Sequence, residues 1–320
     1  MRRRAALAAL IAVALAPASR AADPVKRVGY LSGGAPPEEL AKHLTELGWI
    51  EGKSLQFEVR MAPPGAPPQV LATAVAELVA AKVDVLVAFA DRTDALAAAT
   101  RTIPIVAGFH PDPVGMGLAK TLRQPGGNVT GLSAGVPESV GAWLGMLRTM
   151  RPQLARLAIV HGERGEARMR AVTRSWLDVA TPLGVSISYA PCATLADVGR
   201  ALDALGDPAS AAAFLLFGGM STVALPEAIS KEVHELTVRR RIAAIGDAHQ
   251  GALLDYNANH SDPMRRLAVI VDKVLRGRKA ADIPFELPDR IEIIVNRATA
   301  KAIGAVLTPE ILLRATEMVG

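Results

Sequence analysis

The sequence predicts an α/β protein with two successive doubly wound parallel sheets. Short apolar runs alternate with helical stretches along most of the chain, and this order restarts near Leu157. Val83–Phe89 is an apolar run apart from Asp84, which is typical of a parallel strand buried on both faces. Hydrophobic residues make up 50% of the chain and aromatic residues only 4%, a composition that favours closely packed helix and sheet layers over a β-sandwich.

The individual elements follow from local patterns. Leu55–Met61 alternates apolar and polar residues, as a half-exposed strand does, and the turn Gly33–Pro36 leads into the first helix. Asp91 and Asp112 stand where a helix N-cap is expected. The expected strands are 28–32, 55–61, 83–89, 103–108, 129–132, 157–161, 185–189, 212–217 and 242–245. The expected helices end at Leu47 and Thr100 or span 70–81, 114–122, 164–183, 195–205 and 223–239.

Residues 1–21 have the pattern of a cleavable secretory signal peptide. Arg2–Arg4 are positively charged, Ala5–Ala16 is almost purely apolar, and Ser19 and Ala21 are the small residues that precede a cleavage site. The apolar run is shorter than the about 20 residues that a membrane-crossing helix needs. Export with cleavage after Ala21 is therefore expected, and a retained N-terminal anchor is the alternative.

The net charge of the chain comes mostly from this leader. The whole chain has 36 Lys and Arg against 31 Asp and Glu, a formal charge of +5. Residues 1–21 contain four arginines and no acidic residue, which leaves 32 basic against 31 acidic side chains after cleavage. No basic run with interleaved aromatic residues is present, so nucleic acid is excluded as a partner.

The sequence offers little for catalysis. Cys192 is the only cysteine and is expected to be a packed thiol, and the histidines lack the spacings that hold a metal on a helix. No Gly-x-Ser-x-Gly nucleophile motif is present. The glycine-rich stretch Gln124–Ser133 precedes a strand and lacks the Lys-Ser/Thr ending of a phosphate loop. Neither a metal nor a cofactor is expected.

Polar and glycine-rich segments follow several expected strands. Ligands of open α/β sheets bind at the carboxyl ends of strands, where helix N-termini and free backbone N–H groups converge. Ser32 and Gly33 offer a hydroxyl and a close backbone approach, although an ordinary turn fits equally well. Arg92 could pair with a ligand carboxylate or lie in solvent at the start of a helix, and capping is the favoured role of Asp112.

Several motifs resemble one known family, the ABC-transporter substrate-binding proteins of the tryptophan/tyrosine type. The resemblance runs from about Arg27 to the C-terminus. The matching segments are Leu47–Gly52, Arg101–Val106, Asp112–Gly115 with Gly117-Leu118, Arg123–Ser133, Val271–Gly277, Ala281–Pro284, Ile294–Asn296 and Thr299–Gly304.

This resemblance implies a type I periplasmic-binding fold, in which a hinge joins two doubly wound parallel-sheet lobes. The chain is expected to cross between the lobes near 132–134, at Tyr256-Asn257, and around 288–292. The implied lobes are residues 22–132 plus 257–287 at the N-terminal side and residues 133–256 plus 288–320 at the C-terminal side.

The scaffold motifs match the family, whereas the ligand-facing loops differ from its usual pattern. Ala90-Asp91-Arg92 replaces a Gly-Ser/Thr pair, His161-Gly162-Glu163 replaces an Asn-Pro loop, and Tyr256-Asn257 replaces Tyr-Gly. Strand-end position predicts that polar groups select the ligand's head group and that apolar or aromatic side chains hold its body. The residues expected to line the cleft are Ser32, Gly33, Phe89, Asp91, Arg92, His110, Ser133, His161, Met220, Asp247 and Tyr256.

The implied function is that of the periplasmic solute-binding component of an ABC importer. Its expected partners are a small ligand, such as an amino acid or a related compound, and a permease at the inner membrane. A monomer is expected. Two alternatives stay open: a ligand-sensing module for a membrane receptor, because one scaffold serves both roles, and an enzyme on a doubly wound scaffold.

Overall fold

The computed structural model describes residues 24–63, 66–163, 166–217 and 224–320. The expected signal peptide and Met220 lie outside these ranges, and so does part of the loop after the eighth strand. Within the ranges described, none of the helices combines the length and the apolar character needed to cross a membrane.

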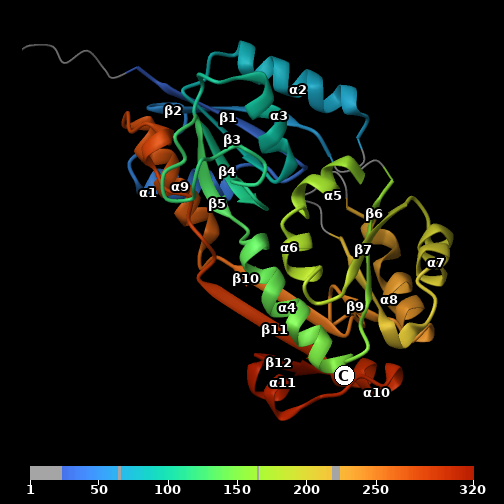
Figure 1. The fold of residues 1–320 in the computed structure, drawn as a ribbon. Coiled ribbons are helices and arrows are strands. Elements are labelled where there is room, and N and C mark those ends of the chain that lie inside the picture. Colours follow the sequence, from blue (N-terminus) through green and yellow to red (C-terminus); the bar gives the residue numbers. More distant parts are fainter. Residues whose placement is uncertain (1–23, 64–65, 164–165, 218–223) are drawn as a thin grey trace, which may run out of the picture.

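The first sheet is fully parallel and has helices on both faces (Figure 1). Its strand order is β2-β1-β3-β4-β5. One face is covered by α1 and α9 and the other by α2 and α3, each pair with its own cluster of buried apolar residues. The bounds are β1 (Lys26–Ser32), α1 (Glu38–Glu46), β2 (Leu55–Met61), α2 (Pro68–Ala80), β3 (Val85–Phe89), α3 (Asp91–Ala99), β4 (Ile105–His110), β5 (Val129–Ser133) and α9 (Pro263–Leu275).

The second sheet has the order β12-β11-β10-β9-β8-β6-β7, and only the β10–β11 pair in it is antiparallel. Its strands are β6 (Arg156–Gly162), β7 (Ser186–Cys192), β8 (Ala211–Leu215), β9 (Ala243–Ile245), β10 (Leu254–Asn259), β11 (Arg290–Asn296) and β12 (Glu317–Val319). The α-helices of this part are α4 (Val136–Met150), α5 (Glu166–Val172), α6 (Trp176–Ala180), α7 (Leu195–Asp203), α8 (Ser230–Arg239), α10 (Arg297–Ile303) and α11 (Pro309–Arg314). Short 3₁₀ turns are η1 (Pro208–Ser210), η2 (Glu227–Ile229) and η3 (Ala280–Asp282).

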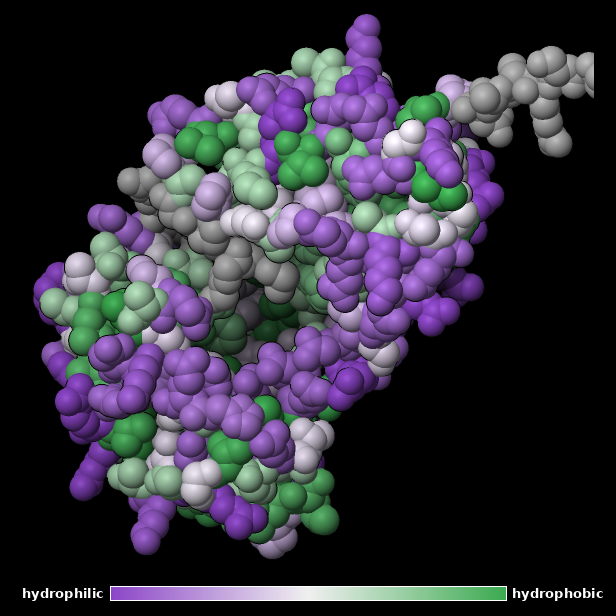
Figure 2. All heavy atoms as spheres, turned by 180° about the vertical axis from the view of Figure 1, so that it is seen from behind, coloured by the Kyte–Doolittle hydropathy of each residue, from purple (hydrophilic) through white to green (hydrophobic). Residues whose placement is uncertain are grey.

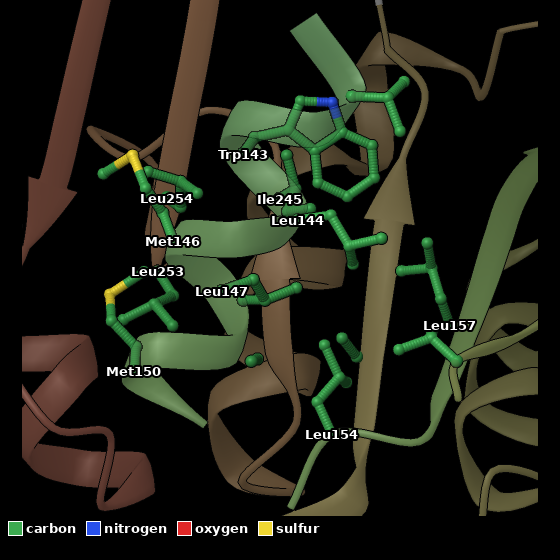
Figure 3. Packing of buried hydrophobic residues seen from close by; sticks show 14 of the residues in the cluster. Trp143, Leu144, Met146, Leu147, Met150, Leu154, Leu157, Ile245, Leu253 and Leu254 are labelled. Atoms are coloured by element: carbon green, nitrogen blue, oxygen red, sulfur yellow. The ribbon is translucent and has the colours of Figure 1, made fainter. Parts of the chain in front are cut away.

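The predicted fold class, two parallel-dominated α/β sheets, is confirmed. The buried strands were recognisable because both of their faces are covered, so their sequences are apolar throughout. In the second part, α4 lays Trp143, Leu147 and Met150 against apolar residues of β6, β9 and β10 (Figure 3). This packing fixes the sheet whose strand ends face the first sheet.

The helix expected at 114–122 is wrong. The structure has turns there, because the N–H groups of Leu118 and Ala119 both bond to the Pro113 carbonyl, at 2.9 Å each. Gly117 adopts a positive φ of 73°, which stops a right-handed helix. Asp112 does cap this turn, as its Oδ1 accepts the Gly115 N–H at 2.7 Å.

Three connections join the two sheets, after β5, after β10 and before β11. They are hydrogen-bonded to one another: the Ser133 N–H donates to the Glu286 carbonyl at 2.9 Å, and the Asp289 N–H donates to the Asn259 carbonyl at 3.1 Å. His260 Nε2 bonds to the Ser133 carbonyl at 2.7 Å. The connections therefore form one bundle at one side of the molecule, which leaves the opposite side open.

Candidate functional site

The carboxyl ends of the strands of the first sheet and of β6 to β10 in the second sheet face a hollow between the two parts of the molecule. Figure 2 shows this hollow from the side opposite to Figure 1. Helix α3 follows β3 of the first sheet, and α5 follows β6 of the second sheet. A side chain of each helix meets the other, so the strand ends of the two sheets are brought together at this point.

An ion pair crosses between the two parts. The Arg168 guanidinium on α5 donates to one carboxylate oxygen of Asp94 on α3, and His110 Nε2 bonds to the other oxygen at 2.8 Å. The side chains of Arg168 and Asp94 are only 17% and 22% exposed. Burial lowers the pKa of Arg168, an effect that nearby Asp91 partly opposes. The pair is a contact that only a closed arrangement of the two parts can make.

Removing this contact is expected to favour an open arrangement. We expect Arg168→Ala to weaken ligand binding about fivefold, since a partly buried pair of this kind contributes about 1 kcal/mol to the closed state. The free variant should also have a larger radius of gyration by small-angle X-ray scattering. Arg174→Ala removes the same charge from an exposed position nearby and should change neither quantity. Equal behaviour of the two variants would contradict the role assigned to the pair.

His110 is fully buried at the end of β4 and is held neutral. Burial lowers its pKa to about 4, although Asp112 and Asp91 act in the opposite direction. A neutral ring beside a carboxylate donates its proton, so Nε2–H faces Asp94. His110 therefore orients the carboxylate that pairs with Arg168.

The lowered pKa of His110 makes stability depend on pH. Between about pH 6.5 and pH 4 the unfolded chain protonates this ring and the folded chain does not, so the free energy of unfolding falls as the pH is lowered. The contribution of His110 is about 3 kcal/mol across this window. Urea unfolding at pH 7, 6, 5 and 4 should show a shallower loss for His110→Gln than for the unchanged protein, and parallel profiles would disprove the assignment.

The hydroxyls of two predicted residues are used inside the first part of the molecule. Ser32 Oγ accepts the Gly34 N–H at 3.0 Å and donates to the Ala35 carbonyl. Ser133 Oγ accepts the Gly135 N–H at 3.1 Å. Both serines are buried, and they shape the turn after β1 and the first connection between the sheets.

Arg92 points into the first part of the molecule. Its side chain is only 1% exposed, and Nε and Nη2 donate to the Ala62 carbonyl at 3.0 and 2.6 Å. Asp91 Oδ1 lies 3.9 Å from Arg92 Nη1. Arg92 thus ties the start of α3 to the loop after β2, rather than lying in solvent.

Phe89 belongs to a row of rings at the ends of β3 and β4. Its centroid lies 5.9 Å from that of Tyr30 and 6.4 Å from that of Phe109, and Phe109 meets the His260 ring at 5.8 Å. The partly exposed Gly33 lies at the end of the neighbouring β1. The row links the strand ends of the first sheet to the connection after β10.

In the second sheet, His161 is buried at the end of β6. Its Nδ1 donates to the Gly162 carbonyl at 2.8 Å, and burial lowers the pKa of the ring. Asp247 and Tyr256 line a cavity of about 340 Å³ at the carboxyl ends of β8 and β9 and beside β10. The other lining residues were not predicted: Phe214, Leu215, Leu216, Phe217, Glu227, Ser230, Ile245, Gly246, Gln250, Asp255 and Asn257.

Comparisons with known proteins agree with this architecture. The tyrosine-binding protein of Clostridioides difficile is 24% identical over 263 residues, which cover 82% of this chain and 74% of that protein. A conserved domain protein from Vibrio cholerae superposes with a TM-score of 0.73 at 24% identity, over 92% of this chain and 100% of the other. An ABC domain from Streptococcus pneumonia in complex with L-Trp superposes with a TM-score of 0.71 at 18% identity, with the same coverage.

The family model of the ABC transporter substrate binding proteins matches residues 38–319. This match covers the second sheet, all three connections between the sheets, and the first sheet except β1 and the turn that follows it. The chain belongs to the ABC transporter substrate binding protein family.

Proposed function

We propose that this protein is the periplasmic solute-binding component of an ABC importer, which takes up a small ligand between its lobes and releases it unchanged. The observation that carries the proposal is the Asp94–Arg168 pair, which joins the strand ends of the two sheets across the hollow. The tyrosine and tryptophan in the names of relatives favour an amino acid or a related compound as the ligand.

The two lobes of the proposal are residues 22–132 with 257–287 and residues 133–256 with 288–320. Sheet membership supports this division except at residues 257–259, which belong to β10 and pair with β11 of the second sheet. Ligand bound to both lobes favours the closed arrangement by its higher affinity for that state. The closed surface would be recognised by a permease at the inner membrane, and the protein would act as a monomer.

The strained turn between β3 and α3 carries no side chain suited to catalysis. Ala90 links β3 to α3 with φ 48° and ψ −125°, a strained strand-to-helix turn of the kind that exposes a nucleophile in some hydrolases. Its methyl group is no nucleophile. Cys192 is buried, and burial raises the pKa of its thiol to about 11, which keeps the thiol protonated and unreactive at neutral pH.

The proposal is tested by expressing the full chain in a Gram-negative host and purifying it from the periplasmic fraction. The mature protein should begin at Ala22. In a thermal-shift screen of amino acids, amines, carboxylates and sugars, a ligand at 100 times its Kd should stabilise the protein by roughly 2.7 kcal/mol. Mass spectrometry should recover that compound unchanged. Chemical conversion of the bound compound, or retention of the protein in the cytoplasm, would overturn the proposal.

A further inference from the structure

The second-lobe cavity is acidic and carries no cationic side chain among its described lining residues. Its acidic members are Glu227, Asp247 and Asp255, and Phe214, Phe217 and Tyr256 supply aromatic surface. Residues 218–223, which precede this part of the chain, contain no charged side chain in the sequence. The cavity therefore combines negative charge with walls suited to a flat or apolar body.

Asp247 contributes a fixed negative charge to this cavity. Its Oδ1 accepts the backbone N–H groups of His249 and Gln250 at 2.9 and 3.3 Å, and its Oδ2 accepts Gln250 Nε2 at 2.8 Å. These bonds hold the carboxylate at the end of β9. The charge of Asp247 acts on the neighbouring Asp255.

Asp255 forms no salt bridge with a lysine or arginine in the part of the chain that the structure describes. It lies on β10 next to Tyr256, and burial together with the charge of Asp247 raises its pKa to about 6. Asn257, His249 and the backbone of Ala248 oppose this shift only in part. A positive group placed beside Asp255 would stabilise the carboxylate and offset this shift.

Ser230 gives an independent indication of a missing ligand group. It lines the cavity at the start of α8 and is 3% exposed, yet its Oγ has no hydrogen-bond partner among the described residues. Most buried polar atoms have a hydrogen-bond partner, so a hydroxyl oxygen at the wall of a cavity is a suitable acceptor for a bound molecule. A ligand N–H group would satisfy this oxygen.

The two arginines at the strand ends already have hydrogen-bond partners elsewhere and do not pair with the acidic side chains of the cavity. Arg168 donates to Asp94, and Arg92 donates to the Ala62 carbonyl. A ligand carboxylate would thus compete with existing partners for either guanidinium, whereas a ligand cation has Asp255 available.

We propose that this cavity binds the protonated amine of the ligand, with the Asp255 carboxylate as its counter-charge and Ser230 Oγ as a further acceptor. The preferred ligands are organic amines with an apolar or aromatic body, ahead of zwitterions and anions of the same shape. This inference rests on the proposed function and specifies its substrate class.

The test is isothermal titration with matched compounds: 2-phenylethylamine, tyramine, tryptamine, butylamine and putrescine, each beside its alcohol and its carboxylate, together with phenylalanine, tyrosine and tryptophan. At least one amine should bind, and its alcohol should bind at least about tenfold more weakly, as expected for a charge-assisted contact. Asp255→Asn should weaken the amine by at least about tenfold and Ser230→Ala by about threefold. Asp178→Asn, which removes an exposed carboxylate from α6, should leave binding unchanged.

The pH dependence of amine binding distinguishes an ion pair with Asp255 from a packing effect at that position. Binding should weaken below about pH 6 as Asp255 takes up a proton, and this dependence should be lost in Asp255→Asn. The other titratable groups around Asp255 are Asp247, His249 and Glu227, which are present in both the unchanged protein and the variant. Because a buried charge is removed, the variant should melt no lower than the unchanged protein at pH 7.5.

Three results would overturn the inference: tighter binding of a carboxylate or an alcohol than of every amine, amine binding that survives Asp255→Asn, or no binding by any amine. In the first two cases reversible binding of an unchanged compound leaves the solute-binding function standing. Chemical conversion of the bound compound would instead refute the proposed function itself.

Discussion

Replacing Gly131 with alanine is expected to abolish folding of the first lobe. Gly131 lies in the middle of β5 with a φ of +143°, and an added Cβ would come within 2.6 Å of the Ala107 nitrogen and 2.8 Å of its carbonyl carbon. Backbone on β4 cannot move aside without breaking the strand pair. The Gly131 carbonyl also accepts the Glu286 N–H at 2.9 Å, so the return connection would shift as well. The expected loss exceeds about 4 kcal/mol.

Gly127→Ala is the matched control for this change. Gly127 lies four residues earlier in the same motif, is exposed, and its added Cβ would meet nothing closer than 3.6 Å. We expect this variant to accumulate and melt like the unchanged protein by circular dichroism. Soluble, cooperatively melting Gly131→Ala protein would contradict the strand geometry described here.

Trp143→Ala is expected to destabilise the second lobe by about 3 to 5 kcal/mol. Trp143 is 3% exposed on α4, with its ring centroid 5.2 Å from that of Trp176 and 5.8 Å from that of Phe214. The neighbouring side chains cannot collapse into a space of this size, because α4 is anchored along its length against β10 (Figure 3). Urea unfolding should show a second-lobe transition at lower denaturant.

Leu177→Ala provides the comparison on neighbouring α6. This side chain is 43% exposed, so its removal should cost less than about 1 kcal/mol. A similar loss in both variants would mean that the aromatic cluster does not dominate the stability of the second lobe.

The strands were the part of the fold most accessible to sequence reasoning. Val85–Phe89 and Ala211–Leu215 are apolar throughout because helices cover both sides of each sheet. Helix limits were harder. The stretch 164–183 has a helical pattern but forms α5 and α6, separated by turns in which the Trp176 N–H bonds to the Thr173 carbonyl.

The sequence analysis assigned residues to the candidate site by one rule, namely their position at the end of an expected strand. That rule placed Asp247 and Tyr256 at the second-lobe cavity. It gave no indication of Asp255 or Ser230, since one lies within a strand and the other begins a helix far from any predicted strand end. Nor could it identify Arg168, whose partner on the other lobe is set by tertiary structure alone.

Local hydrogen bonds already occupy some of the predicted side chains. The Ser32 hydroxyl, next to a Gly-Gly turn, is taken up by the Gly34 N–H and the Ala35 carbonyl. Short polar side chains in turns commonly bond to nearby backbone in this way. Whether the predicted cleft residues contact a ligand stays a prediction for each of them.

Closure of the two lobes on a ligand that is later released unchanged can be measured by small-angle X-ray scattering on periplasmically purified protein. We expect a smaller radius of gyration when the compound found in the thermal-shift screen is added, fully reversed when the compound is dialysed away intact. An unchanged radius of gyration at saturating ligand would contradict this closure.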